Sequence, residues 1–509
     1  MNSGKRVLLL ILEITAIVFM ASGLGWSVLA QEGGWTTPTV ISTPSEISWF
    51  PDLAVDPFGT VHVIWCLTTP LGGIRGLQEQ VNYTHWGGES WSEPNDIVPP
   101  SADIVRNAIA TDLSGNTHLL FGGSVYGGFT LYHQRAPVGE AWSAGAWSTP
   151  HRINQGISYM GDMAVDSQGV IHIVYDDTIR RGDEDELVLS DVFYRRSSDN
   201  GRTWSVPVRL YLEPLLGSAR PYMEVDRNDV IHVTWDEGWD RLTPTRNDTY
   251  YGVYVSSSDG GETWTLPTVI DHPDETAVQL TVGSDGQSGV MLVWRSMERD
   301  EFFYQWSVDG GSSWEEQSEI PRVLARPWTI PFDMYDMATD SAGRIHLLVV
   351  GRQSSESDAL LGVYHLVWDG SSWSTPTRIF AEVGLYPEYP KIVVHEGNQL
   401  HTVWFTREGN VWDQEVNREI WYSSSQSSAP HQPVIPLPTS TPIPPTPTFM
   451  PIPTATPYPT VSFDHTGLPD GLHTDSDDVL RLAVALLPVA LLILAVIVIK
   501  KGWSRKLRR

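Results

Sequence analysis

Polar side chains recur at two positions of a repeated sequence motif, and their chemistry suits the binding or cleavage of a polar ligand. Carboxylates can act as general acids or bases, a tyrosine can act as a nucleophile, and arginines bind carboxylates through paired hydrogen bonds. The first position reads Asp52, Ala108, Asp162, Tyr222, Gln279, Asp336 and Lys391, and the position two residues earlier reads Phe50, Arg106, Met160, Arg220, Ala277, Met334 and Tyr389. The alternative is a hydrated channel whose lining residues bind no ligand.

Two internal repeats define the elements that must position these residues. A tryptophan, usually in the pattern Trp-x-x-Pro, recurs every 50 to 60 residues at Trp35, Trp91, Trp147, Trp204, Trp264, Trp314 and Trp373. Out of phase with it, an apolar strand, an Asp/Gly turn and an alternating strand recur in residues 53–65, 109–121, 163–175, 223–235, 280–294, 337–349 and 392–404. A Tyr-rich third strand follows each copy, and the Trp-x-x-Pro segment forms the fourth strand.

Seven units of four short strands predict an all-β fold, a seven-bladed β-propeller with four-stranded blades over residues 31–426. Side-chain alternation on the innermost strands places the two polar positions towards the central channel. The first Trp-x-x-Pro strand precedes the first full repeat, and the seventh repeat lacks a fourth strand of its own. We therefore expect the N-terminal strand to complete the last blade and to leave no open sheet edge.

The turn between the third and fourth strands carries the most specific motif. The segments SSDNGRTW (197–204), SSDGGETW (257–264) and SVDGGSSW (307–314) fit Ser-x-Asp-x-Gly-x-x-Trp. The Asp can accept backbone N–H groups of its own turn, and the Gly can adopt a left-handed conformation. The chain thus resembles the Asp-box, or bacterial-neuraminidase-repeat, propellers of the sialidase superfamily, a resemblance that indicates fold more specifically than activity.

The resemblance implies a set of site residues. A sialidase-like reaction needs arginines that bind the substrate carboxylate, a tyrosine nucleophile with a glutamate, and an aspartate as acid/base. On this chain, Arg106, Arg220 and Arg326 are the candidate arginines, Tyr389 and Glu388 the candidate nucleophile and its base, and Asp52 or Asp162 the candidate acid. The first arginine of the family pattern is missing, because Trp49-Phe50-Pro51 stands in its place. The catalytic set is therefore incomplete by motif.

Further candidates suit a sugar ligand. Tyr222, Asp336 and Lys391 would line the channel mouth, and the long charged loops 236–250 and 406–420 add Trp239 and Trp412. A tryptophan beside polar groups can stack on the apolar face of a sugar ring. The alternative is that these loops are simply solvated.

Six histidines occupy one strand position: His62, His118, His172, His232, His346 and His401. They fall on six different blades and cannot converge on one ion, so we interpret them as structural and expect no metal or other cofactor. The single cysteine, Cys66, excludes a disulfide framework and a cysteine-ligated metal site. A net charge of −28 argues against a nucleic-acid partner.

The two ends of the chain read as export and anchoring segments. Residues 1–30 resemble a secretion signal, with an uncleaved N-terminal anchor as the alternative. Residues 427–478 form a Pro/Thr-rich stalk, 479–499 a transmembrane helix and 500–509 a basic tail that would lie on the cytoplasmic side. This organisation predicts a single-pass plasma-membrane protein with an extracellular propeller.

Three functional hypotheses follow. The first is a membrane-anchored propeller that binds a glycan or a cell-surface protein at the axial mouth. The second is an exo-sialidase or another glycoside hydrolase that uses the same mouth. The third is a purely structural surface protein, which the long charged loops disfavour.

Overall fold

The computed structural model describes residues 34–70, 77–101, 104–124, 129–180, 188–213, 216–238, 250–270, 276–326, 335–354, 360–409 and 416–436. These residues form strands and two short 3-10 helices, η1 (Val138–Glu140) and η2 (Ala144–Ala146), without an α-helix. Over the same ranges, no helix has the length and apolar character needed to span a membrane. The predicted signal, the predicted transmembrane helix and the basic tail lie outside the described residues.

Four antiparallel sheets have the same plan, in which each strand pairs with the next one along the chain. Their strands are β6 (Ile104–Thr111), β7 (Asn116–Gly123), β8 (Thr130–Pro137) and β9 (His151–Arg152); β10 (Gly161–Val165), β11 (Ile171–Arg180), β12 (Val188–Ser197) and β13 (Val208–Arg209); β14 (Gly217–Val225), β15 (Ile231–Gly238), β16 (Tyr250–Ser257) and β17 (Thr268–Ile270); and β18 (Ala277–Ser284), β19 (Val290–Ser296), β20 (Phe302–Ser307) and β21 (Ser318–Glu319). A fifth sheet contains β22 (Val323–Ala325), β24 (Ile345–Gln353), β25 (Gly362–Trp368) and β26 (Thr377–Phe380), with β23 (Asp336–Thr339) paired to β24.

An eight-stranded sheet brings the two ends of the strand-forming region together. It contains β27 (Leu385–His395), β28 (Gln399–Glu408), β29 (Arg418–Gln426) and β1 (Thr39–Val40), followed by β2 (Ile47–Val55), β3 (Val61–Pro70), β4 (Leu77–Trp86) and β5 (Asn95–Ser101). A single parallel pairing, Ile47 with Arg418, joins the two halves. The N-terminal β1 pairs antiparallel with β29, and the Thr36 N–H donates to the Ser424 carbonyl at 2.8 Å. The sheet thus has the N-terminal closure that the repeat phase predicts.

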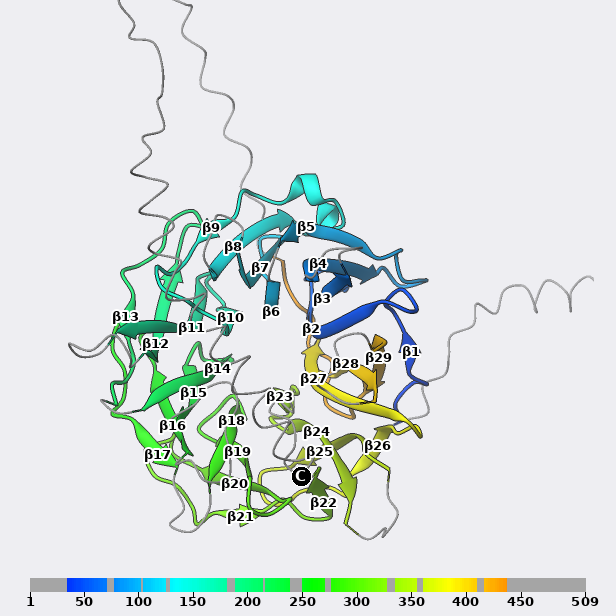
Figure 1. Ribbon diagram of the computed structural model, residues 1–509. Helices are drawn as coiled ribbons and strands as arrows, with labels where there is room; N and C mark the ends of the chain where they lie inside the picture. Colours follow the sequence, from blue (N-terminus) through cyan, green and yellow to red (C-terminus); the bar gives the residue numbers. More distant parts are fainter. Residues whose placement is uncertain are drawn as a thin grey trace, which may run out of the picture. The chain divides into compact units, whose positions relative to one another are not determined.

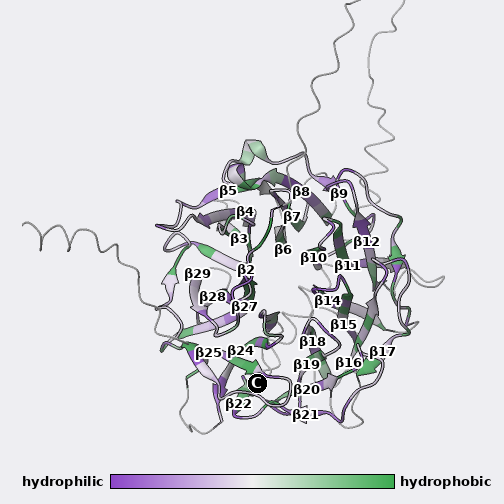
Figure 2. Cartoon of the chain, turned by 180° about the vertical axis from the view of Figure 1, so that it is seen from behind, coloured by the Kyte–Doolittle hydropathy of each residue, from purple (hydrophilic) through white to green (hydrophobic). Residues whose placement is uncertain are grey.

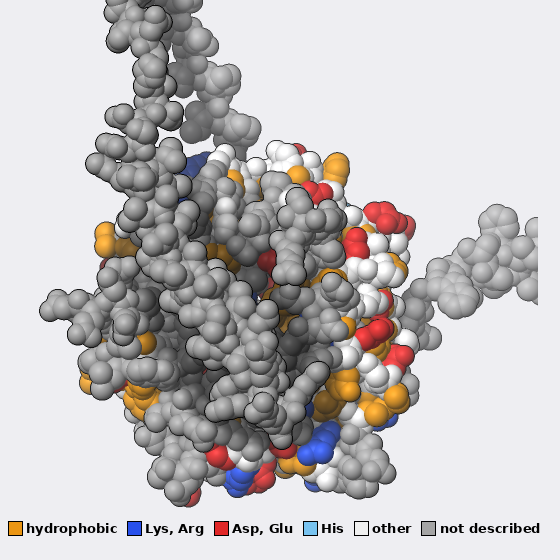
Figure 3. Space-filling view, viewed as in Figure 1, with side chains coloured by type: hydrophobic (Ala, Val, Ile, Leu, Met, Phe, Trp, Pro, Cys, Tyr) orange, Lys and Arg blue, Asp and Glu red, His pale blue; other side chains and the backbone are white. Residues whose placement is uncertain are grey.

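The sheets follow one another around a central opening, and the strands nearest to it are β2, β6, β10, β14, β18, β23 and β27 (Figure 1). Figure 2 shows apolar residues along strands such as β11, and the core lies where such strands of neighbouring sheets face each other. Acidic side chains mark the described part of the surface in Figure 3, in keeping with the acidic composition. The chain therefore forms a β-propeller, as the sequence predicts.

The repeated histidines have the structural role that the sequence analysis assigns to them. In three sheets the histidine of the second strand lies between the turn aspartate and a third-strand tyrosine. His172, for example, is hydrogen-bonded to Tyr194 Oη at 2.7 Å and lies 3.2 Å from Asp166 Oδ2. His62 and His232 are similarly placed. Within the described ranges, no group of three or more His, Cys, Asp or Glu residues could hold a metal ion.

Candidate functional site

Bulges on the innermost strands present the candidate site residues. The pairing of the first and second strands shifts at Trp49/Asp52, Val105/Asn107, Ala219/Tyr222, Val278/Thr281 and Glu388/Lys391. One residue in each bulge has a positive φ, between 50° and 59°: Phe50, Arg106, Arg220, Gln279 and Tyr389. Non-glycine residues adopt this conformation rarely, and a bulge redirects the side chain. In five of the inner strands, the same kind of bulge therefore orients the side chain at the earlier of the two repeated positions.

The bulges correct the sequence alignment of one inner strand. The sequence analysis places Gln279 with Asp52 and Ala277 with Phe50. In the structure Gln279 is the bulge residue equivalent to Phe50, and Thr281 takes the position equivalent to Asp52. Alignment on the turn aspartate would have given this register, because Asp285 follows Gln279 by six residues, as Asp56 follows Phe50.

Seven of the predicted site residues line one small axial cavity. They are Asp52, Arg106, Asp162, Arg220, Tyr222, Tyr389 and Lys391, and Asn107 lies among them. The cavity has a volume of about 20 Å³, room for about one water molecule. The inner strands therefore converge as predicted, and the described part of the channel admits only a very small group.

The axial aspartates also connect neighbouring sheets. Asp52 Oδ2 accepts the Ile109 N–H, Asp162 Oδ2 accepts the Met223 N–H, and Asp336 Oδ2 accepts the Ile392 N–H, each at 2.8 Å. Burial raises the pKa of Asp52 to about 7, although the nearby Lys391 ammonium opposes the shift. Burial raises the pKa of Asp162 as well. One oxygen of each carboxylate is thus structural, and Asp52 has the raised pKa that a general acid needs.

Lys391 lies among these carboxylates and two aromatic rings. Its Nζ is 3.9 Å from Asp336 Oδ1 and 5.3 Å from the centre of the Tyr222 ring. Tyr222 Oη donates to the same Asp336 oxygen at 2.6 Å. Burial alone would lower the pKa of Lys391, but the surrounding carboxylates raise it. The centre of the channel is therefore a compact ionic cluster.

Two arginines lie at the same cavity. The guanidinium carbon of Arg106 is 4.6 Å from the centre of the Phe50 ring, and Arg106 also hydrogen-bonds the Tyr389 side chain. Arg220 Nη1 is 3.1 Å from Asp236 Oδ2, and both side chains are almost fully buried. Arg220 Nε and Nη2 are buried without a hydrogen-bond partner in the described residues. Arg220 can therefore still donate to an incoming acceptor.

The amide of Asn107 provides a second unsatisfied group at the cavity. Its Oδ1 and Nδ2 are both buried without a hydrogen-bond partner in the described residues. A buried polar atom without a partner costs about 1–3 kcal/mol. Such groups beside a cavity indicate a place for a ligand or an ordered water.

Glu388 and Arg326 lie in a separate cluster. Glu388 Oε1 is 3.1 Å from Arg326 Nη1 and 2.6 Å from Arg407 Nε. All three side chains are buried, and none of them lines the axial cavity. Glu388 is therefore bound by two guanidiniums, and the structure does not bring Arg326 to the axial arginines.

Sequence reasoning missed Asp236, the partner of Arg220, and Asp176, whose charge acts on Arg106. Both follow the aromatic residue that ends the apolar part of the second strand, in Tyr175-Asp176 and Trp235-Asp236. Reading this position across the repeats would have found them. The predicted stacking residues Trp239 and Trp412 lie outside the described residues.

Several solved structures are similar to this chain. A protein of unknown function from Dyadobacter fermentans shares 13% identity, with 77% of this chain and 98% of that chain covered and a TM-score of 0.47. The NanB sialidase from Streptococcus pneumoniae shares 13% identity, with 78% and 70% covered and a TM-score of 0.42. An ulvan lyase shares 14% identity, with 76% and 93% covered and a TM-score of 0.47.

No curated protein matches the sequence. The sequence profile of the family described as "BNR repeat-like domain" matches residues 138–402, which is more than half of the 509-residue chain. The matched region contains the three complete Asp-box turns and five inner strands, β10, β14, β18, β23 and β27. The chain therefore belongs to the BNR repeat-like family of β-propellers.

Proposed function

We propose that this protein is a membrane-anchored, extracellular propeller that binds the carboxylate of an acidic glycan at its axial mouth. The observation that supports this best is the pair of buried, unsatisfied groups at one cavity, Arg220 Nε/Nη2 and Asn107. Arg106 adds a second cation there. A carboxylate fits a guanidinium bidentately, and the cavity, with room for about one water molecule, would admit one carboxylate oxygen but not a whole sugar ring. The sugar itself would lie across the mouth.

The same propeller would have seven blades. The eight-stranded sheet has two halves of four strands, β27–β28–β29–β1 and β2–β5, joined by one parallel pairing. Counting each half as one blade gives seven with the five other sheets. This count agrees with the seven sequence repeats.

Binding is favoured over hydrolysis by the position of Glu388. A tyrosine nucleophile needs a neighbouring base, but the Glu388 carboxylate is bound by Arg326 and Arg407 and lies outside the axial cavity. A glycoside hydrolase remains the second candidate, because the raised pKa of Asp52 suits an acid and Tyr389 lines the cavity.

The predicted stalk starts near the end of β27 that lies away from Tyr389. Ser427 and Gln432, at the start of the predicted stalk, donate backbone N–H groups to Asn398 and Glu396 in the β27–β28 turn. Tyr389 precedes Glu396 by seven residues on β27, which corresponds to roughly 23 Å along a strand. The uncharged run 482–499 and the basic residues after it support the anchor itself.

Calorimetry on the full chain in detergent micelles tests the binding function. The acidic probes are 3′-sialyllactose and digalacturonate, and lactose is the neutral control. We expect an acidic probe to bind and Asn107→Leu to weaken it at least tenfold. Thr117→Val, which removes another buried, unpartnered polar atom, should bind like the wild type. Full affinity of Asn107→Leu for the acidic probes would contradict the proposal.

Mass spectrometry of the same incubations separates binding from hydrolysis. Sugar release that Asn107→Leu reduces would establish the hydrolase instead. Binding without release would support the lectin-like function.

A further inference from the structure

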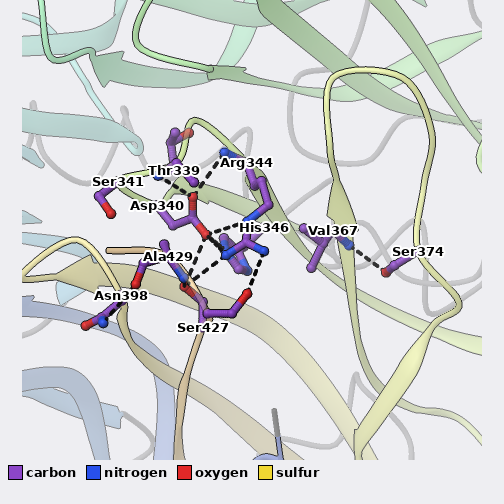
Figure 4. Close-up of polar contacts among 12 residues, drawn as sticks. Thr339, Asp340, Ser341, Arg344, His346, Val367, Ser374, Asn398, Ser427 and Ala429 are labelled. Carbon is purple, nitrogen blue, oxygen red and sulfur yellow. Dashed lines mark hydrogen bonds and ion pairs between the residues drawn. The ribbon is translucent and has the colours of Figure 1, made fainter. Parts of the chain in front are cut away.

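A second cavity, of about 740 Å³, lies where the two ends of the propeller chain meet (Figure 4). Its lining comes from three places: Trp35 before β1, the sheet of β24–β26, and the end of β29 with the segment that follows it. The volume falls in the range of small-molecule binding sites. The turn between β27 and β28 lies beside this cavity. It is seven residues along the chain from Tyr389, which lines the axial mouth, so the two cavities are distinct.

The described residues beside this cavity lack a contact that three other sheets make. In those sheets a glycine of the Asp-box turn packs against an aromatic ring of the preceding sheet. A Cβ added to Gly201, Gly261 or Gly311 would stand 2.2 Å from His133, 2.1 Å from Tyr194 or 2.7 Å from Tyr254. The equivalent ring at the closure is His365, which lines the cavity.

The sequence lacks the packing glycine at the corresponding position. The packing glycine lies three residues before the tryptophan in each complete Asp-box, as Gly261 does before Trp264. Three residues before Trp35 the chain has Glu32. The glycine of the complete Asp-box motif, which permits the close approach in the other sheets, is therefore absent from this position of the sequence.

The wall of the cavity carries no net charge. Trp35 Nε1–H donates to His365 Nδ1 at 3.4 Å, so His365 donates through Nε2 to His346 at 2.9 Å. His346 Nε2 in turn donates to Asp340 Oδ2 at 3.1 Å, so every ring nitrogen of the two imidazoles has a hydrogen-bond partner. The Arg344 guanidinium is 2.7 Å from the same Asp340 oxygen (Figure 4). A wall in which each charge is already paired favours a neutral ligand over an anion or a cation.

One buried acceptor at this cavity still needs a donor. Asn398 is 6% exposed, and its Nδ2 donates to the Ala429 carbonyl at 3.1 Å. Its Oδ1 is buried without a hydrogen-bond partner in the described residues. The hydroxyls of Thr375, Thr377 and Ser425 line the same space. The site thus offers aromatic edges, hydroxyls and an acceptor that requires a ligand O–H or N–H.

We infer that this seam cavity is a binding site for a sugar residue of a neutral glycan. A pyranose combines an apolar face for Trp35 and His365 with hydroxyls that both donate and accept. One such hydroxyl would satisfy Asn398 Oδ1. The site would act beside the axial mouth and does not depend on what the mouth binds.

Saturation-transfer NMR on the full chain in detergent micelles tests the inference. The probes are the methyl glycosides of glucose, galactose, mannose and N-acetylglucosamine, each alone. We expect at least one to bind and Thr377→Trp, which fills the cavity from an exposed position, to reduce the signal at least fivefold. Thr268→Trp is the matched control, because Thr268 pairs with Tyr254 as Thr377 pairs with His365.

A second blocking variant keeps the test decisive if Thr377→Trp fails to fold. Thr375→Trp enters the same cavity, and Leu266→Trp is its counterpart beside β17. The inference is overturned if no neutral probe binds, or if both blocking variants bind like their controls.

Discussion

Gly261 packs so closely on Tyr194 that a Cβ on the glycine would stand 2.1 Å from the tyrosine hydroxyl oxygen. Gly261 belongs to an Asp-box turn, and Tyr194 belongs to the third strand of the preceding sheet. The tryptophan of the same turn, Trp264, meets the Tyr194 ring edge-on at 4.9 Å. The Asp-box is therefore a contact between sheets as well as a turn within one.

We predict that Gly261→Ala destabilises the fold by about 3 kcal/mol or more, because it combines steric overlap with a positive φ of 83°. Gly310→Ala is the matched control. Gly310 also has a positive φ, 71°, but a Cβ there meets nothing within 4 Å, so its cost should be about 1 kcal/mol. Urea unfolding of the two variants checks the difference, and equal costs would show that the contact with Tyr194 is unimportant.

The second prediction concerns His133, the residue that takes the place of Tyr194 in its own sheet. Burial lowers the pKa of His133 well below 6.5. The unfolded chain therefore binds a proton more readily, so the stability contributed by neutral His133 is complete above pH 6.5 and is lost as the pH falls. When the pH falls from 7.5 to 5, the free energy of unfolding should decrease in both proteins. We expect the decrease to be about 1–2 kcal/mol smaller in His133→Tyr than in the wild type.

The tyrosine in this variant can keep the hydrogen bond to His118, as Tyr194 does to His172. Unfolding titrations at several pH values measure the difference. Parallel profiles for wild type and variant would mean that other groups account for the acid sensitivity in this pH range.

Much of the fold could be predicted because its signals are local. The tryptophan spacing, the Asp-box turns and the phase of the repeats each report on a few neighbouring residues, and they led to the propeller and to its closure by the N-terminal strand. The one register error came from aligning Leu280 with Leu53 instead of aligning the turn aspartates Asp285 and Asp56. The apolar pattern of that repeat is two residues out of step with its turn.

The candidate site was only partly predictable, because its contacts are not local. The inner-strand columns correctly bring Arg106, Arg220 and Tyr389 to one cavity. Glu388 is adjacent to Tyr389 in sequence, yet its carboxylate turns to Arg326 on another sheet. A contact between residues 62 positions apart cannot be predicted from the alternation of polar and apolar residues within one strand.

The third prediction concerns Asp52 at the axis. Its pKa is raised from 3.8 to about 7, so the folded state binds the proton more tightly and stability falls as the pH rises from about 4 to 7. We expect Asp52→Asn to flatten the profile in this window and to be up to roughly 2 kcal/mol more stable than the wild type at pH 8. The full shift would represent about 4 kcal/mol, but the variant also loses the attraction of Lys391.

Unfolding free energies at pH 4, 6 and 8 test this prediction. The asparagine can still accept the Ile109 N–H, so the connection between the sheets is kept. A variant that is less stable than the wild type at pH 8 would show that Asp52 is ionised and paired with Lys391 in the folded protein.

The last prediction concerns the Arg220–Asp236 pair. Both side chains are 1% exposed, and Asp236 also accepts the Gln279 and Leu280 N–H groups at 2.8 and 3.0 Å. Arg220→Gln leaves a buried carboxylate without its cation and should cost about 3–5 kcal/mol. Arg220→Gln with Asp236→Asn removes both charges, while the asparagine oxygen can still accept a backbone N–H. We therefore expect the double variant to be more stable than Arg220→Gln by about 1–2 kcal/mol, with a coupling energy of at least about 2 kcal/mol in the double-mutant cycle. If the two losses are additive, Asp236 stabilises the fold only by accepting backbone hydrogen bonds from β18, and its contact with Arg220 contributes nothing.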